Sequence, residues 1–171
     1  MKVRYVLCLL ICFCFLQGFG QVRSHVKKHK KPYLKLVESF SRKTVPGMRG
    51  SPVSTNTYFI VVWATKTYPE TFFWRGENGW LPCNMFKAHK IPPENRRNMQ
   101  FAMEYSTEFV TGDQVHRGDT LQLSPIVGGK FPIPSEILDS SRNDLYFKTG
   151  GSGWLKFHID TIIKKHDLVM P

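Results

Sequence analysis

The sequence predicts an all-β fold, a sandwich or barrel of about seven short strands that follows a flexible, basic N-terminal segment. Three observations support this prediction. From residue 55 onward, aromatic and β-branched residues come in short runs. Glycine, proline, asparagine and aspartate separate these runs. Nearly all the excess positive charge precedes them. We therefore expect a signal peptide at 1–20, a flexible basic tail at 21–52 and a β-rich globular domain at 53–171.

The first 20 residues have the layout of a secretory signal peptide. Lys2 and Arg4 precede an uncharged apolar run at 5–16, and small residues, Gly18 and Gly20, stand three and one positions before a cleavage point at Gln21. The run is shorter than the ~20 residues that span a bilayer. A retained signal anchor is the alternative, but no second apolar run of that length follows. The sequence predicts a secreted, extracellular protein.

The basic charge is concentrated before residue 51. Residues 21–50 hold nine Lys and Arg and one acid, whereas residues 51–171 hold thirteen Lys and Arg and twelve acids. The densest cluster consists of Lys27, Lys28, His29, Lys30 and Lys31. Its like charges repel one another, so it should be disordered when free.

Several functions are open to this cluster. It is similar to the basic clusters of heparin-binding proteins, which predicts binding to an anionic polysaccharide or an acidic matrix. Proteolytic processing at the paired basic residues and a plain solvated tail are the alternatives. Nuclear localisation and nucleic-acid binding, which such strings also suggest, conflict with the signal peptide.

The first strands are expected at 57–64 and 71–75, with a turn at 76–79 and a return strand from Trp80. A further strand at 99–109 is expected because apolar and polar residues alternate there, with Tyr105 and Phe109 on the buried face. A helix opening at Pro93 would spread these aromatic residues around its axis, so the strand is preferred.

Later in the chain, short strands are expected at 120–123, 145–148 and 154–159. A short C-terminal helix is expected at 160–166, where Asp160 can cap its N-terminus.

An internal repeat supports the hairpin arrangement. Residues 72–81 and 146–155 align without a gap and share Gly-x-x-Gly-Trp-Leu. Glycine-flanked turns suit hairpins, and each tryptophan would begin a return strand. Trp80 and Trp154 are therefore expected at equivalent hairpin positions. With Trp74, they are either core anchors or exposed rings that stack on a sugar or a partner.

Two shorter signals have two interpretations each. Arg117-Gly118-Asp119 is either an integrin-type recognition turn or an ordinary β-turn. Cys83 is the only cysteine after the signal peptide, so it is either a buried thiol or the site of a disulfide-linked dimer.

No catalytic motif stands out. A nucleophile elbow, a zinc-protease motif, a phosphate-binding loop and zinc-type cysteine pairs are missing from the sequence, so we expect no enzyme, no metal and no cofactor. The sequence favours a secreted binding or matrix-associated protein whose basic tail attaches to anionic glycans. One alternative is a secreted signalling factor or inhibitor that binds a cell-surface receptor, with the tail as propeptide. Another is a carbohydrate-active enzyme whose two carboxylates are brought together by the fold.

Overall fold

The structure is a computed structural model that describes residues 32–48, 50–77, 79–96, 104–129, 131–137 and 142–169. Residues 1–31 lie outside the described residues. The predicted signal peptide and the basic cluster at 27–31 belong to that part of the chain.

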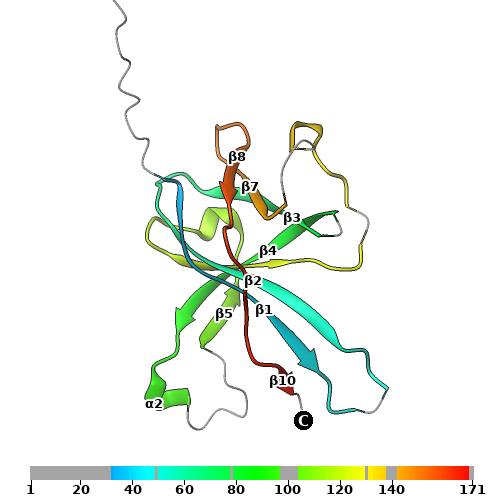
Figure 1. The fold of residues 1–171 in the computed structure, drawn as a ribbon. Coiled ribbons are helices and arrows are strands. Elements are labelled where there is room, and N and C mark those ends of the chain that lie inside the picture. Colours follow the sequence, from blue (N-terminus) through cyan, green and yellow to red (C-terminus); the bar gives the residue numbers. More distant parts are fainter. Residues whose placement is uncertain are drawn as a thin grey trace, which may run out of the picture. The chain divides into compact units, whose positions relative to one another are not determined.

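The described chain forms a mixed β-sheet that curls into a half-barrel (Figure 1). The all-β prediction is therefore confirmed, although the described residues hold ten strands where about seven were expected. The strands are β1 (Leu34–Val45), β2 (Ser54–Trp63), β3 (Pro69–Gly76), β4 (Gly79–Lys90), β5 (Tyr105–Phe109), β6 (Thr120–Pro125), β7 (Asp144–Thr149), β8 (Leu155–His158), β9 (Ile163–Lys164) and β10 (Leu168–Val169). They are ordered β10-β1-β2-β6-β4-β3-β7-β8; β5 also pairs with β4, and β9 with β1.

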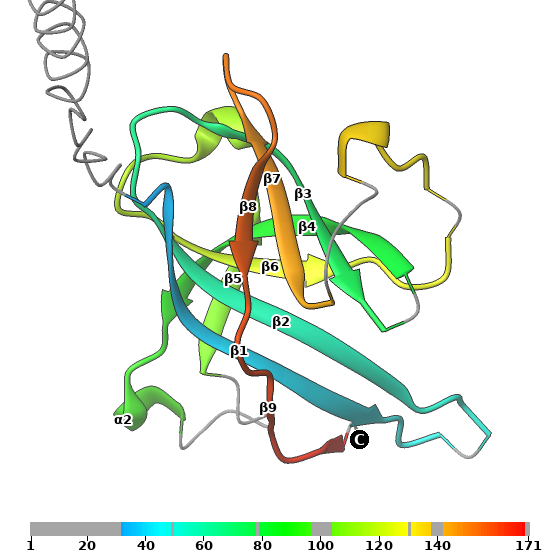
Figure 2. The same cartoon turned by 45° about the horizontal axis from the view of Figure 1, so that its top comes forward.

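One continuous C-terminal segment links the two ends of this sheet (Figure 2). β8 pairs antiparallel with β7, and further along the chain β9 and β10 pair in parallel with β1. The helix expected at 160–166 is therefore wrong. The β-branched run from Thr161 to Ile163 suits an extended backbone, and pairing with β1 gives that backbone hydrogen bonds such as Lys165 N–H to the Ser41 carbonyl (2.9 Å).

The flexible tail expected at 21–52 is wrong for residues 34–45, which form β1. This strand pairs with β2 from Leu34 opposite Trp63 to Thr44 opposite Ser54. A bulge between Leu36 and Glu38 shifts the register, so the inward-facing residues change parity partway along the strand. Because of this shift, apolar and polar residues do not alternate regularly along the segment. Its charged residues therefore made the sequence look like part of the flexible basic tail.

The core fills the concave side of the half-barrel. Trp63 of β2 packs edge-on against Phe72 and Phe147 (centroids 6.2 and 5.8 Å apart), and Phe72 stacks on Phe147 at 5.6 Å. All three rings are buried. These contacts join β2 to β3 and β7, which the sheet order places far apart, and so hold the curl together.

The remaining strand predictions have mixed outcomes. The strands expected at 71–75, 120–123 and 145–148 fall within β3, β6 and β7, and β2 covers the strand expected at 57–64 except Ala64. Residues 99–103 of the strand expected at 99–109 lie outside the described residues, and β5 forms its last five residues. Residues 93–96 form one helical turn, α2 (Pro93–Arg96). Phe109 is 61% exposed instead of buried. Among the described strands, β5 pairs with β4 alone, and the Phe109 ring meets Phe86 edge-on at 5.7 Å on the surface.

Candidate functional site

The candidate site lies on the outward face of the four neighbouring strands β4, β3, β7 and β8. Phe72 and Trp74 of β3 point into the core, so Phe73 and Arg75 point outward, because successive side chains of a strand alternate between its faces. Phe73 is directly opposite Tyr146, and Arg75 is directly opposite Trp80. Directly opposed residues share a face, which brings these four side chains together.

The rings on this face contact one another in pairs. Trp80 and Tyr146 meet edge-to-face, with centroids 5.4 Å apart and planes at 82°. Trp154 meets Phe73 in the same way at 5.8 Å and 69°. Phe73 is buried beneath its neighbour, whereas Trp80, Tyr146 and Trp154 are half-buried and keep ring surface in contact with solvent. We call this set the outer aromatic face; it consists of Phe73, Arg75, Trp80, Tyr146, Trp154 and Lys156.

A buried carboxylate positions cations at the edge of the outer aromatic face. Asp144 has no exposed side-chain surface; its Oδ2 lies 2.7 Å from Lys156 Nζ and its Oδ1 lies 2.8 Å from His158 Nδ1. The Lys156 ammonium also lies 5.8 Å from the centroid of the Tyr146 ring. The hydrogen bond to Asp144 raises the pKa of Lys156, so the ammonium stays charged at physiological pH. Asp144 thus holds a cation beside an exposed ring.

This arrangement suits a ligand with both apolar and anionic groups. Half-exposed aromatic rings offer flat apolar surface, and indole and phenol edges remain able to form hydrogen bonds. The Arg75 guanidinium and the Lys156 ammonium can pair with carboxylate or sulfate groups. A sulfated or carboxylated sugar chain carries both features, since a pyranose ring has an apolar C–H face and its substituents carry the charge.

The structure separates the three tryptophans that the sequence singled out. Trp80 and Trp154 lie on the outer aromatic face. Trp74 is only 8% exposed and points to the opposite side of the sheet, where its ring packs against Phe59 at 5.4 Å. Trp74 is therefore a core residue that also lines a cavity.

The two repeat windows each span an antiparallel strand pair, β3–β4 and β7–β8. Trp80 lies within β4, whereas Trp154 precedes β8 by one residue. Phe72 and Tyr146, which are aligned in the sequence, face opposite sides of the sheet. The β3–β4 turn is tight, with Gly76 paired to Gly79, and the β7–β8 turn is longer. Because the turns differ in length, aligned residues of β3 and β7 face opposite sides of the sheet.

Sequence reasoning missed Phe73, Tyr146 and Lys156 as partners of the tryptophans. None of these three residues carries a sequence signal that links it to Trp80 or Trp154. The pairing of β3 with β7, which joins segments more than 70 residues apart, brings Phe73 beside Tyr146, and the pairing of β7 with β8 adds Lys156. Strand order of that kind is set by tertiary packing, which a single sequence does not display.

The Arg117-Gly118-Asp119 sequence forms a hydrogen-bonded turn before β6. Gly118 adopts a positive φ of 99° and donates its N–H to the Trp63 carbonyl at 2.7 Å. The Asp119 carboxylate accepts a hydrogen bond from the His116 N–H (2.8 Å) and pairs with Lys87 (2.9 Å). These contacts give Asp119 a structural role in the turn, and the integrin interpretation stays a prediction.

The Asp119 pKa reflects the same contacts. Partial desolvation raises it, but the hydrogen bond from His116 and the Lys87 ammonium together outweigh that effect, so the pKa is lowered. The carboxylate is therefore ionised throughout the physiological range.

Cys83 of β4 faces inward and packs against the core. Its Sγ lies 3.9 Å from the Leu81 carbonyl oxygen, and burial raises the pKa of the thiol well above its usual range. This is the environment of a small hydrophobe with low thiolate reactivity. A dimer linked through Cys83 stays a prediction.

Within the described ranges, no group of three or more His, Cys, Asp or Glu side chains is placed to hold a metal ion. The same residues include no helix long and apolar enough to cross a membrane.

Comparison of the chain with protein-family models, with curated proteins and with solved structures gives no match.

Proposed function

We propose that the protein is a secreted, non-enzymatic binding protein for anionic glycans, with the outer aromatic face as its sugar-binding surface. The observation that carries the proposal is the convergence of Trp80 and Trp154 with Tyr146 on one outward sheet face, beside the cation of Lys156. In this proposal each Gly-x-x-Gly-Trp-Leu turn contributes one tryptophan to the face.

The ring contacts favour binding because they fix the aromatic groups in advance. Tyr146 restrains Trp80 from one side, and Phe73 supports Trp154 from below. A ligand that packs on restrained rings loses little side-chain entropy on binding, so more of the contact energy appears as affinity. The half-buried tryptophans would contribute by removing apolar ring and sugar surface from water.

Charge supplies the selectivity for anionic sugars. Arg75 and Lys156 lie within the face, and the buried Asp144 holds the Lys156 ammonium in place. The basic cluster at 27–31 would add long-range attraction, since its five basic residues are adjacent in sequence. The face would thus provide short-range contacts, and the cluster would provide most of the electrostatic attraction.

Calorimetric titration of the chain from Gln21 onward with a heparin hexasaccharide tests this proposal. Trp80→Ala should weaken binding about tenfold, because it removes a half-buried aromatic ring from the face. Phe109→Ala is the matched control, since it removes an exposed aromatic ring from β5, outside the face. If both variants bind the hexasaccharide as tightly as the parent, the outer aromatic face is not the binding surface.

A further inference from the structure

A cavity opens on the concave side of the sheet, opposite the outer aromatic face. It has a volume of about 620 Å³ and lies between the β1–β2 and β3–β4 strand pairs at the mouth of the half-barrel. Sites for small molecules commonly occupy the mouths of barrels and range from about 300 to 1,000 Å³. Six of the lining residues indicate the chemistry of a ligand: Ser41, Thr55, Thr57, Trp74, Leu81 and Ile162.

The wall formed by β2 changes in polarity along one face. Trp63, Val61 and Phe59 are fully buried and apolar, and the next two residues on that face are Thr57 and Thr55. Ser41 of β1 lies directly opposite Thr57. Thr55 is exposed, whereas Thr57 is half-buried, so the hydroxyl groups follow the wall from the core toward solvent. The cavity therefore has a hydroxyl-bearing outer wall and an inner end that is apolar apart from the Trp74 Nε1–H, for which the described residues provide no hydrogen-bond partner.

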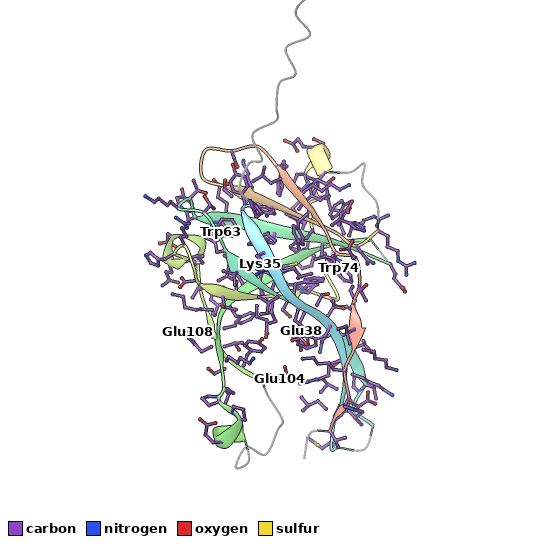
Figure 3. The ribbon with its side chains drawn as sticks, turned by 60° about the vertical axis from the view of Figure 1, so that its left-hand side comes forward. Lys35, Glu38, Trp63, Trp74, Glu104 and Glu108 are labelled. Atoms are coloured by element: carbon purple, nitrogen blue, oxygen red, sulfur yellow. The ribbon has the colours of Figure 1, made fainter. Side chains whose placement is uncertain are left out.

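The inner end is built around Trp74. Its ring packs on Phe59, and Leu81 and Ile162 pack against the same core (Trp74 is labelled in Figure 3). Gly76 allows this placement, because a Cβ at that position would lie 2.8 Å from Cζ3 of Trp74. The aromatic ring can therefore sit against the backbone of its own strand and form part of the cavity wall.

The charged residues at the cavity neutralise each other. Arg142 forms an ion pair with Glu77, and both side chains are largely exposed at the rim. The other lining residues are uncharged. A ligand that carries a net charge would gain little attraction here and would lose hydration, so an uncharged ligand is favoured.

We propose that this cavity binds a small, uncharged amphipathic molecule. Its apolar chain would lie against Trp74, Leu81 and Ile162, and its hydroxyl-bearing head would exchange hydrogen bonds with Ser41, Thr55 and Thr57. Serine and threonine hydroxyls both donate and accept, which suits an alcohol head group. This site is separate from the outer aromatic face, so each proposal can fail without the other.

Calorimetry with 1-decanoylglycerol, used below its critical micelle concentration, tests the proposal. The parent chain should bind it saturably. Thr55→Phe, which places a ring in the cavity mouth, should weaken binding at least tenfold. Asn56→Phe is the matched control, because the neighbouring residue of β2 points to the opposite side of the sheet and should leave the affinity unchanged. Equal melting temperatures of the two variants would show that both are folded.

A second variant and a second probe test the ligand chemistry. Thr57→Val removes one hydroxyl at nearly constant volume and should weaken decanoylglycerol binding about three- to tenfold, the effect of one hydrogen bond. Decanoate should bind more weakly than decanoylglycerol. No saturable binding by the parent, equal affinities of Thr55→Phe and Asn56→Phe, unchanged affinity of Thr57→Val, or tighter binding of decanoate would each overturn the proposal.

Discussion

The rings of Trp80 and Tyr146 meet edge-to-face at 5.4 Å, although β3 separates the strands that carry them. The contact therefore runs diagonally over the outer side of β3, and it makes the two rings one surface. The Lys156 ammonium beside Tyr146 extends this surface to β8. Rings so placed are accessible to a ligand and are held in position by each other.

Substitution of Tyr146 should reveal this dependence. Tyr146→Ala should weaken binding of the heparin hexasaccharide about fivefold, because it removes one ring and releases Trp80 from its contact. Tyr146→Phe keeps the ring and should retain most of the affinity. Calorimetric titration measures both. If the alanine and phenylalanine variants bind equally well, the ring of Tyr146 does not contribute.

Lys165 fastens the C-terminal segment to the rest of the sheet. Its Nζ lies 2.7 Å from Glu38 and 2.9 Å from Glu104, two carboxylates labelled in Figure 3. It also lies 4.0 Å from the centroid of the Phe40 ring. Lys165→Met should lower the free energy of unfolding by about 1–2 kcal/mol, because both carboxylates lose this partner while partly buried.

Lys164 provides the control for that change. It is the exposed neighbour of Lys165 on the same segment, so Lys164→Met should change the stability by less than about 0.5 kcal/mol. Urea denaturation of the two variants measures the difference. Equal midpoints would show that the cluster around Lys165 contributes nothing to stability.

Gly112 is required by close packing of the backbone. A Cβ at Gly112, in the short 3-10 turn Gly112–Gln114, would lie 1.7 Å from the Pro69 carbonyl oxygen at the start of β3. Gly112→Ala should therefore cost about 1–3 kcal/mol of stability, the usual range for overpacking. Gly153→Ala meets nothing within 4 Å and should be neutral or slightly stabilising. Thermal melts that rank these variants the other way would contradict the packing at Gly112.

Asp119 should contribute to stability in a pH-dependent way. Its pKa is lower in the folded chain than in the unfolded chain, so its contribution is present above the unfolded value of about 4 and is lost as the pH falls through the folded value. Asp119→Asn should reduce the free energy of unfolding at pH 7 by less than about 1 kcal/mol, since the group is partly exposed. The difference between parent and variant should shrink by pH 3. Urea titrations at both pH values would refute this role if the difference grew instead.

The sequence shows local strand patterns better than it shows pairing. Residues 57–64 are recognisable because a continuous aromatic and β-branched run is typical of a buried strand. β1 is not recognisable, because its bulge changes the alternation between Leu36 and Glu38. The C-terminal strands are too short to carry a pattern and depend on hydrogen bonds to β1.

The sequence likewise predicts only some residues of the candidate site. Trp80 and Trp154 are conspicuous in the sequence because both follow a Gly-x-x-Gly turn. Trp74 looks like an equal candidate, but strand alternation turns it toward Phe59 and the core. Asp144 gives no signal at all. Its importance depends on β8, which places His158 directly opposite it and Lys156 diagonally across, opposite Tyr146.

The salt dependence of heparin-hexasaccharide binding tests the central proposal most directly, because it separates ring contacts from electrostatic ones. Each ion contact formed releases counterions, so the logarithm of the affinity falls linearly with the logarithm of salt concentration, with a slope set by the number of contacts. Replacing Lys27, Lys28, Lys30 and Lys31 with alanine should flatten this slope. Trp80→Ala should lower the affinity by a similar factor at every salt concentration and leave the slope unchanged, while Phe109→Ala should follow the parent. A Trp80→Ala line that coincides with the parent line would contradict a glycan-binding role for the outer aromatic face.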